Sequence, residues 1–332
     1  MADDLLRLEV WSWREATRIS SLPIHKNIIG KMGEQMKKLN DSGKGRYCLA
    51  FIAIGISLLL CTFSAAGQDE TKDNSSAPNA SADMLFALLQ IQANSQGCLN
   101  DLDLDVASAS SDLSATGLEG AAADEVLRKL LETNSNVVEA VTFSKEGKII
   151  SAECKGCEGG EGADISSQEH ISHILEDKTS TFSRQFLLVE GYNGTALAYP
   201  VFSPQGEFLG GISTIIEPDK MLNNIVAAQL HYDIENRSNI TDYSFWMMDL
   251  DGLIAYDRDA SQIGKNLFEN PLYKPYPGLL TLGERMIKER SGHGYYSFQV
   301  TEGNKKVVTK ESYWTTAGLR GREWRLIITK MM

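Results

Sequence analysis

The sequence lacks the patterns by which the common catalytic sites are recognised. It contains no HExxH motif, no phosphate-binding glycine loop and no Ser/His/Asp arrangement. A positive excess is also missing, because 44 Asp and Glu outnumber 32 Lys and Arg and the net charge is -12. That balance argues against a nucleic-acid partner. We therefore expect a protein that is not an enzyme, needs no cofactor and binds no nucleic acid.

Charge is absent altogether from residues 47–67, a run long enough to cross the hydrocarbon core of a membrane. Before this run, nine Lys and Arg stand against six Asp and Glu, a net +3, which leaves -15 for the remainder of the chain. The positive-inside rule predicts that residues 1–46 are a cytoplasmic tail, unless they reflect a misassigned start, and that everything after the span lies outside the cell.

The same run also fits a cleaved signal peptide. Met36-Lys37-Lys38 would be its basic start, and Ser64-Ala65-Ala66 a small-residue cleavage site. The first alternative gives a membrane protein with a single transmembrane helix, the second a secreted protein. In both cases residues 68–82, which are polar, small and proline-containing, read as a flexible linker.

A helical region follows at 83–133. Its long first helix is predicted from apolar residues that recur every three or four positions, and Gly117 and Gly120 end it. These apolar residues are Leu85, Leu88, Leu99, Leu102, Val106, Ala109 and Leu113. A second, shorter helix spans 121–132. We interpret the long helix as a stalk.

Two similar regions come next, 134–217 and 241–332, joined by a helix within 218–240. Each opens with a hairpin whose turn pairs an acidic residue with glycine, Glu146-Gly147 and Asp251-Gly252. Each continues through a polar, helix-containing stretch into closing strands. The pattern predicts an α+β fold in which one unit with a central antiparallel sheet occurs twice.

This layout of one span, a stalk helix and two PAS-like modules resembles the double Cache extracytoplasmic sensor domain over residues 83–330. In the first module the resemblance rests on GADIS at 162–166 and YPVF at 199–202. In the second it rests on DGLIAYD at 251–257, Ile263-Gly264, NPLY at 270–273, Ser291-Gly292 to Tyr296, YWTT at 313–316 and Trp324-Arg325. The second pattern is similar to Cache modules of methanogenic archaea.

The resemblance implies signal transduction that begins with a small organic ligand, an amino acid, amine or carboxylate, in the membrane-distal first module. Family members often pass the signal to an effector domain, but none follows the second module here. We therefore expect a sensor that signals through a separate partner, with the stalk helix as a route to a homodimer. The amino-acid-binding variety has Arg followed by Trp-Tyr, whereas Arg184 precedes Gln185 and Phe186, so amino-acid specificity is not carried over.

Candidate ligand residues follow from the strands. The pattern of residues 182–186 predicts one strand of period two, from which Arg184 would bind the carboxylate of a ligand through two hydrogen bonds. The competing interpretation is an arginine that is exposed to solvent at the surface. The other first-module candidates are Asp164, Gln185, Tyr192, Tyr199 and Ser213. The second-module counterparts are Tyr256, Asp257, Tyr296 and Lys310. Trp314 is expected in the core.

The cysteines allow several interpretations. Cys154 and Cys157 form a CxxC motif that we expect to be a disulfide outside the cell. Zinc with His170 and His173, or redox activity, are alternatives, but the motif lacks both a tight ligand set and a thioredoxin-like context. Cys98 is the odd thiol, free to bridge to the motif or to a second chain. The alternative functions are therefore a surface interaction protein without a ligand and a CxxC redox or zinc protein.

Overall fold

The structure is a computed structural model that describes residues 80–156, 160–188, 191–236, 243–300 and 306–332. The predicted tail, the predicted span and most of the predicted linker lie outside the described residues. Across the described ranges, no helix combines the length and apolar character needed to cross a membrane.

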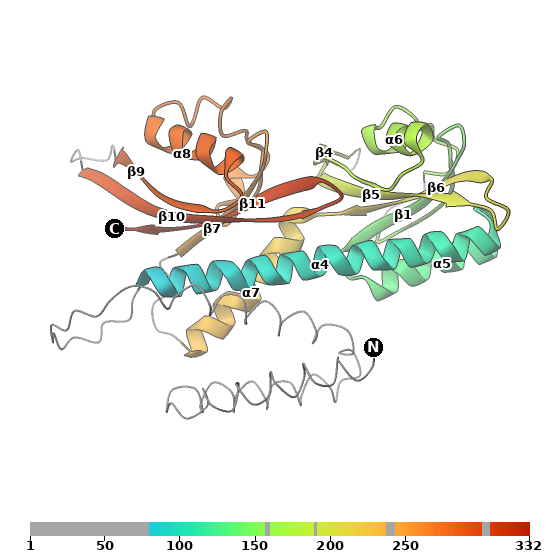
Figure 1. The fold of residues 1–332 in the computed structure, drawn as a ribbon, viewed down its shortest axis with the longest axis horizontal. Helices are drawn as coiled ribbons and strands as arrows, with labels where there is room; N and C mark the ends of the chain where they lie inside the picture. Colours follow the sequence, from blue (N-terminus) through green and yellow to red (C-terminus); the bar gives the residue numbers. More distant parts are fainter. Residues whose placement is uncertain (1–79, 157–159, 189–190, 237–242, 301–305) are drawn as a thin grey trace, which may run out of the picture. The chain divides into compact units, whose positions relative to one another are not determined.

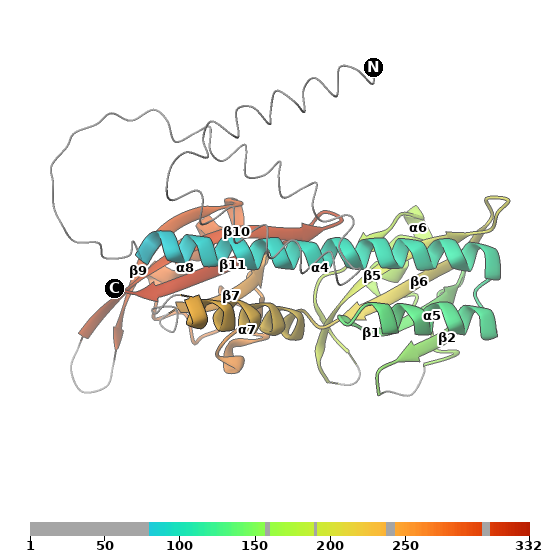
Figure 2. The same cartoon turned by 90° about the horizontal axis from the view of Figure 1, so that it is seen from below.

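Helix α4 (Ala80–Thr116) is the long helix that the sequence predicts, and α5 (Ala121–Thr133) folds back beside it (Figure 2). Helix α4 runs along both sheets and contacts β5 and β6 of the first sheet and β10 and β11 of the second (Figure 1). Its buried side chains recur at helical spacing: Met84, Leu88, Ile91, Leu99, Leu102, Val106, Ala109 and Leu113. Leu85, expected on this face, is instead 41% exposed, because Met84 takes the core position. Gly117 ends the helix in a left-handed conformation, as predicted.

The first module is built on an antiparallel sheet with the strand order β2-β1-β6-β5-β3, and β4 pairs with β5. Helix α6 covers one face of this sheet, and α4 with α5 covers the other (Figures 1 and 2). The bounds are β1 Val137–Ser144, β2 Ile149–Cys154, α6 Glu169–Asp177, β3 Thr181–Phe182, β4 Phe186–Leu187, β5 Asn193–Phe202 and β6 Phe208–Ile216.

The second module repeats this plan, and α7 (Pro218–Asn236) connects the two. Its antiparallel sheet has the order β8-β7-β11-β10-β9, and α8 covers the face opposite α4. The bounds are β7 Tyr243–Asp249, β8 Ile254–Asp257, η2 Ala260–Gln262, α8 Pro277–Lys288, β9 Gly292–Val300, β10 Lys306–Leu319 and β11 Arg322–Met331. In both sheets the opening hairpin pairs with the last strand, which confirms the predicted α+β duplication.

The sheets separate two kinds of apolar core. One continuous cluster lies between the sheets and α4, α5 and α7, and it includes residues of both modules. Smaller clusters lie on the other faces, one under α6 and one under α8. Trp314 is buried in the latter, as predicted. The α6 and α8 sides thus hold the smaller apolar clusters, and a cavity of about 530 Å³ lies on each of them.

One strand prediction is wrong. Residues 182–186 do not form a single strand, because the chain is in β3 only to Phe182 and resumes pairing in β4 at Phe186. Ser183 interrupts the ladder: its hydroxyl accepts a hydrogen bond from the Ala196 backbone N–H at 2.9 Å and donates to the Arg184 carbonyl at 2.6 Å. The predicted period-two placement of Arg184 therefore fails.

Candidate ligand sites

A cavity of about 260 Å³ lies where the two modules meet, and larger cavities of about 530 Å³ each lie in the first and second modules. The first-module cavity is bounded by the sheet, by α6 and the loop before it, and by β4. It is lined by Glu139, Val141, Ile149, Gly160, Ala163, Asp164, Ile165, Gln168, His170, Phe186, Leu187, Leu188, Ser213 and Ile215.

His170 is the most deeply buried polar side chain of this cavity, with 2% of its surface exposed. Helix α6 places it beside Ile171 and Ile174, and its ring stacks on Phe186 with 5.5 Å between centroids. Within the described ranges its ring nitrogens have no hydrogen-bond partner. Burial lowers the pKa of His170 to about 4, so the imidazole is neutral near pH 7 and offers one donor and one acceptor.

The charged groups of the first-module cavity are acidic. Glu139 is half-buried on β1, and Asp164 is exposed at the rim. The Asp164 carboxylate accepts bonds from the Ser166 hydroxyl and backbone N–H at 2.6 and 3.0 Å, which lower its pKa and keep it ionised. No Lys or Arg is among the described lining residues. The cavity therefore suits a neutral or positively charged ligand better than an anion.

The structure brings only two of the predicted first-module residues, Asp164 and Ser213, to this cavity. Tyr199 lies on the other face of the sheet, where its hydroxyl donates to Asp103 of α4 at 2.7 Å. Tyr192 contacts Lys220 at the start of α7, with 5.7 Å between the ammonium nitrogen and the ring centroid. Gln185 is buried, and neither amide atom has a hydrogen-bond partner within the described residues.

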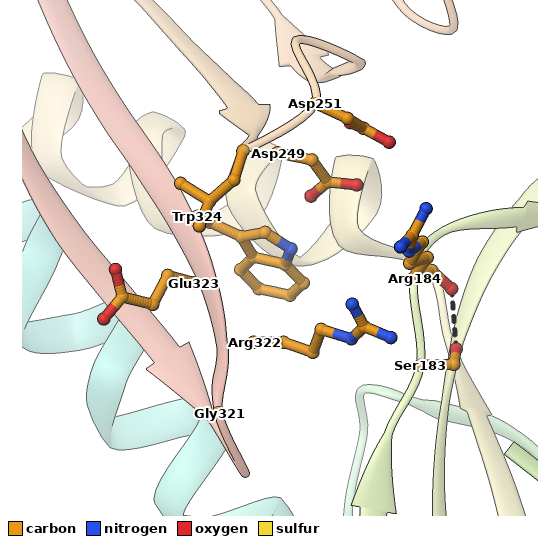
Figure 3. Close-up of a pocket in the computed structure, with 9 residues that line it drawn as sticks. Ser183, Arg184, Asp249, Asp251, Gly321, Arg322, Glu323 and Trp324 are labelled. Atoms are coloured by element: carbon orange, nitrogen blue, oxygen red, sulfur yellow. Dashed lines mark hydrogen bonds between the residues drawn. The ribbon is translucent and has the colours of Figure 1, made fainter. Parts of the chain in front are cut away.

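Arg184 reaches the inter-module pocket instead (Figure 3). This pocket is lined by Ser183, Arg184, Asp249, Leu250, Asp251, Gly321, Arg322, Glu323 and Trp324. Arg184 and Arg322 extend toward the same space as the Asp249 carboxyl group (Figure 3). Burial, reinforced by the charge of Asp251, raises the pKa of Asp249 to about 7, although both arginines oppose the shift.

The second-module cavity lies between its sheet and the segment that includes η2 and α8. It is lined by Ser244, Trp246, Ile254, Asp257, Arg258, Asp259, Gln262, Leu267, Tyr273, Leu279, Tyr296, Lys310 and Thr329. Three of the four predicted residues, Asp257, Tyr296 and Lys310, meet here. Tyr256 does not, because it faces the core on the α4 side.

Two tyrosines contribute to the chemistry of the second cavity: Tyr273, which was not predicted from the sequence, and Tyr296, which was. Tyr273 donates to the Gln262 side-chain carbonyl at 2.7 Å, and burial raises the pKa of Tyr273 to about 12. Burial also raises the pKa of Tyr296. In the first module, His170 was not predicted to line the cavity, because it was considered only as a zinc ligand together with His173. Its position among the isoleucines of a short helix is the sequence feature that indicates a buried histidine.

The cysteines and histidines are not gathered into a metal centre within the described residues. Cys154 is disulfide-bonded. Its expected partner, Cys157, lies outside the described residues, so that pairing stays a prediction. Cys98 is a free thiol whose pKa is raised by burial. His173 contacts Thr179 and Asp177, at 3.0 and 3.2 Å, and does not line the first-module cavity.

Comparison with known proteins finds a family model that matches part of this arrangement. Residues 97–218, which include every residue lining the first-module cavity, match a model described as the sensor domain of HK/GC/chemotaxis-like proteins. A search of curated proteins finds no match.

Solved structures match a larger part of the chain. An extracellular ligand binding receptor from Desulfohalobium retbaense is 28% identical over 75% of this chain, with a TM-score of 0.61, and the chain spans 40% of that receptor. The ligand-binding domain of the Pseudomonas fluorescens chemoreceptor CtaA, in complex with L-serine, is 17% identical with a TM-score of 0.52, over 76% of this chain and 96% of that one. The domain of the Pseudomonas aeruginosa amino acid chemoreceptor PctC, in complex with GABA, is 15% identical with a TM-score of 0.51, over 76% of this chain and 100% of that one.

At such identities the two chemoreceptor domains show a common fold and no more. Together with the family model and the receptor at 28% identity, they confirm the resemblance inferred from the sequence, although an archaeal origin stays a prediction. Residues 97–218 are thus similar to the HK/GC/chemotaxis-type sensor domain, and the described chain has the double Cache-like fold seen in extracellular ligand-binding receptors.

Proposed function

We propose that the protein is an extracytoplasmic sensor that binds a small organic molecule in the first-module cavity. The observation that carries the proposal is His170, a buried, neutral imidazole that faces a cavity of about 530 Å³ without a described hydrogen-bond partner. A neutral imidazole that faces a cavity can donate one hydrogen bond and accept another, so it can bind and orient a small polar ligand.

Within the amino acid, amine and carboxylate classes, the lining favours an amine. Glu139 and Asp164 supply negative charge at the cavity, and no described lining residue supplies positive charge. Apolar side chains such as Val141, Phe186 and Ile215 would surround the rest of the ligand. The protein then acts by binding rather than by catalysis, with the ligand shifting the balance between module arrangements.

The test is a thermal-shift screen of amines, neutral amides, amino acids and carboxylates on the purified full-length chain, after native mass spectrometry for a co-purified molecule. An amine that raises the melting temperature in wild type, but not in His170→Leu, supports the proposal. His173→Leu is the matched control, since His173 lies on the same helix but outside the cavity. A protein that no compound stabilises, or a shift that survives His170→Leu, would contradict the proposal.

We propose further that two copies meet through the first turns of α4. Leu85, Phe86 and Leu89 are exposed there, and Leu85 and Leu89 share one helix face at i,i+4 spacing. Light scattering on the purified chain should give a dimer that Leu85→Ser/Leu89→Ser converts to a monomer. Leu272→Ser, which removes another exposed leucine, should leave the dimer intact.

The predicted location, on a membrane or secreted, depends on residues 47–67. The similar receptor from Desulfohalobium retbaense is described as extracellular, which supports a position outside the cell. The intact mass of the protein recovered from cells separates the alternatives. A mass that includes residues 47–67 supports a membrane anchor, whereas cleavage after Ala66 supports secretion.

A further inference from the structure

The second-module cavity holds two opposite charges that do not neutralise each other. Lys310 projects from β10. Asp257 lies at the end of β8, which β7 and β11 separate from β10 in the sheet. Both line the cavity, yet within the described residues no ion pair joins them. Lys310 has no hydrogen bond at all among the described residues, and its ammonium nitrogen lies 5.6 Å from the Phe298 ring centroid.

Incomplete charge compensation shows in both groups. Burial lowers the pKa of Lys310 and raises the pKa of Asp257, so each group is shifted toward its neutral form. The charge of the other group opposes the shift in both cases but does not cancel it. A buried charge without a direct counter-ion is costly. A ligand that brings both counter-charges would remove that cost at both ends of the cavity.

The other two charged residues of the cavity make hydrogen bonds within the chain. Arg258 donates to the Tyr243 carbonyl at 2.7 Å. Asp259 accepts from the Ser261 backbone N–H and from Gln262, each at 3.0 Å. Asp257 accepts one backbone N–H, from Asp259 at 2.8 Å, on a single carboxylate oxygen. The Lys310 ammonium group and one carboxylate oxygen of Asp257 thus have no described hydrogen-bond partner.

Polar and apolar neighbours complete the cavity. Tyr296 pairs with Lys310 across β9 and β10, and its hydroxyl has no described hydrogen-bond partner. Trp246, Leu267 and Leu279 supply apolar surface for an alkyl group.

We propose that the second-module cavity binds a small zwitterion, whose carboxylate pairs with Lys310 and whose ammonium group pairs with Asp257. The apolar lining accommodates its alkyl portion. This site is separate from the first-module cavity, whose described charged lining residues are only acidic. The protein would therefore bind two ligands of different charge. The proposal does not depend on the function proposed above.

The experiment compares matched ligands by titration calorimetry on the purified full-length chain. L-leucine is tested against 3-methylbutylamine and 4-methylpentanoate, which lack the carboxylate and the amine respectively. The same comparison is made for 5-aminopentanoate, pentylamine and pentanoate, because these place the two charges farther apart. At least one zwitterion should bind, and each of its singly charged analogues should bind about ten-fold more weakly or worse.

Variants then assign the site. Lys310→Met and Asp257→Asn should each weaken the zwitterion about ten- to a hundred-fold, and Asn keeps the oxygen that accepts the Asp259 N–H. Lys330→Met is the matched control, because Lys330 contacts the Tyr243 ring and does not line the cavity. Circular dichroism should show that each variant is folded. The comparison of zwitterions with their singly charged analogues uses wild type only, so it tests the proposal even if a variant does not fold.

The outcomes separate this proposal from the first. Binding of neither zwitterion, equal binding of a singly charged analogue, or unchanged affinity in folded Lys310→Met overturns the zwitterion site. Affinity for the zwitterion that is lost in His170→Leu and kept in Lys310→Met would move the ligand to the first-module cavity and also overturn it. An amine that stabilises the protein through His170 bears on the first cavity alone.

Discussion

Arg320 and Asp103 form a two-pronged ion pair that ties the second module to helix α4. The Arg320 Nε and Nη2 atoms lie 2.8 and 2.7 Å from the two carboxylate oxygens of Asp103. Tyr199 of the first module bonds to the same carboxylate and to Arg320. Three elements far apart in sequence thus meet at one carboxylate. Any rotation of the modules against α4 must break these bonds, so this cluster is a natural point of coupling.

Breaking the cluster should weaken the protein modestly. Because Arg320 is 37% exposed, solvent screens the pair, and we expect Arg320→Gln to cost about 0.5–1 kcal/mol. Urea unfolding of Arg320→Gln, Asp103→Asn and the double variant measures the coupling. Arg290→Gln, at a more exposed pair with Glu323, is the control and should change little. Additive effects of the two substitutions would show that the pair contributes nothing.

A larger effect is expected at Arg325, which is buried on β11 and binds the end of α8. Its Nε donates to the Met286 and Glu289 carbonyls at 2.7 and 3.2 Å, and its Nη1 lies 2.9 Å from Glu323. Arg325→Met removes the bond to the buried Met286 carbonyl, and it leaves the Glu289 carbonyl with Trp314 and the Glu323 carboxylate with Arg290 as their remaining partners. We expect a loss of about 3 kcal/mol in the free energy of unfolding.

Chemical denaturation measures this loss. Arg290→Met is the matched control, because Arg290 pairs with the same Glu323 from a side chain that is 74% exposed. Arg325→Lys should fall between wild type and Arg325→Met, since an ammonium group keeps the charge without the planar fork. Equal stability of Arg325→Met and Arg290→Met would show that the carbonyl contacts are not needed.

The inter-module pocket should make stability depend on pH through Asp249. Its pKa is raised to about 7, above the value of about 4 for an unfolded aspartate. The folded state therefore holds a proton that the unfolded state has lost. The resulting stabilisation is complete below pH 4 and is lost as the pH rises through about 7.

The measurement is the free energy of unfolding of wild type and Asp249→Asn at pH 5 and at pH 8. Between these values wild type should lose about 2–4 kcal/mol more than the variant, whose amide does not titrate. Asp251→Asn is the control; it removes a neighbouring charge and should reduce the loss only slightly. Parallel profiles for wild type and Asp249→Asn would rule out a titrating, buried Asp249.

Much of the fold follows from local patterns in the sequence. The spacing of Leu88, Leu99 and Leu113 indicated the long helix, and two acidic-glycine turns indicated the repeated hairpins. At Gly252 the reason is physical: its φ is 89°, and a Cβ there would lie 2.4 Å from the Phe268 ring. Such positions leave a mark in the sequence because few other residues fit.

The sites were less predictable, because lining a cavity depends on which face of a strand a residue occupies. Asp257, Tyr296 and Lys310 were anticipated, but Tyr256 lies one residue from Asp257 and points to the opposite side. Arg184 was misplaced because Ser183 replaces a ladder contact and ends β3 early. His170 gave only a weak signal, since its role depends on Phe186, a partner that lies on β4.

His170 itself should make stability fall in mild acid. Its pKa is about 4 in the folded chain, below the value of about 6.5 for an unfolded histidine, because burial disfavours the charged ring. The stabilisation is therefore complete above pH 6.5 and is lost as the pH falls from 6.5 to 4, in the direction opposite to that of Asp249. We expect the loss to reach about 3 kcal/mol, and His170→Phe, which can still stack on Phe186, should not show it.

Unfolding measured from pH 7 to pH 4 tests this directly, with His173→Phe as the control, because His173 is on the exposed side of the same helix. NMR titration of the His170 ring adds an independent measurement. A ring that titrates near 6.5 would place His170 in contact with water rather than in a dry cavity, and it would remove the argument that a ligand must satisfy its nitrogens. A ring that stays neutral to about pH 4 and shifts on addition of an amine would establish both its burial and its contact with the ligand.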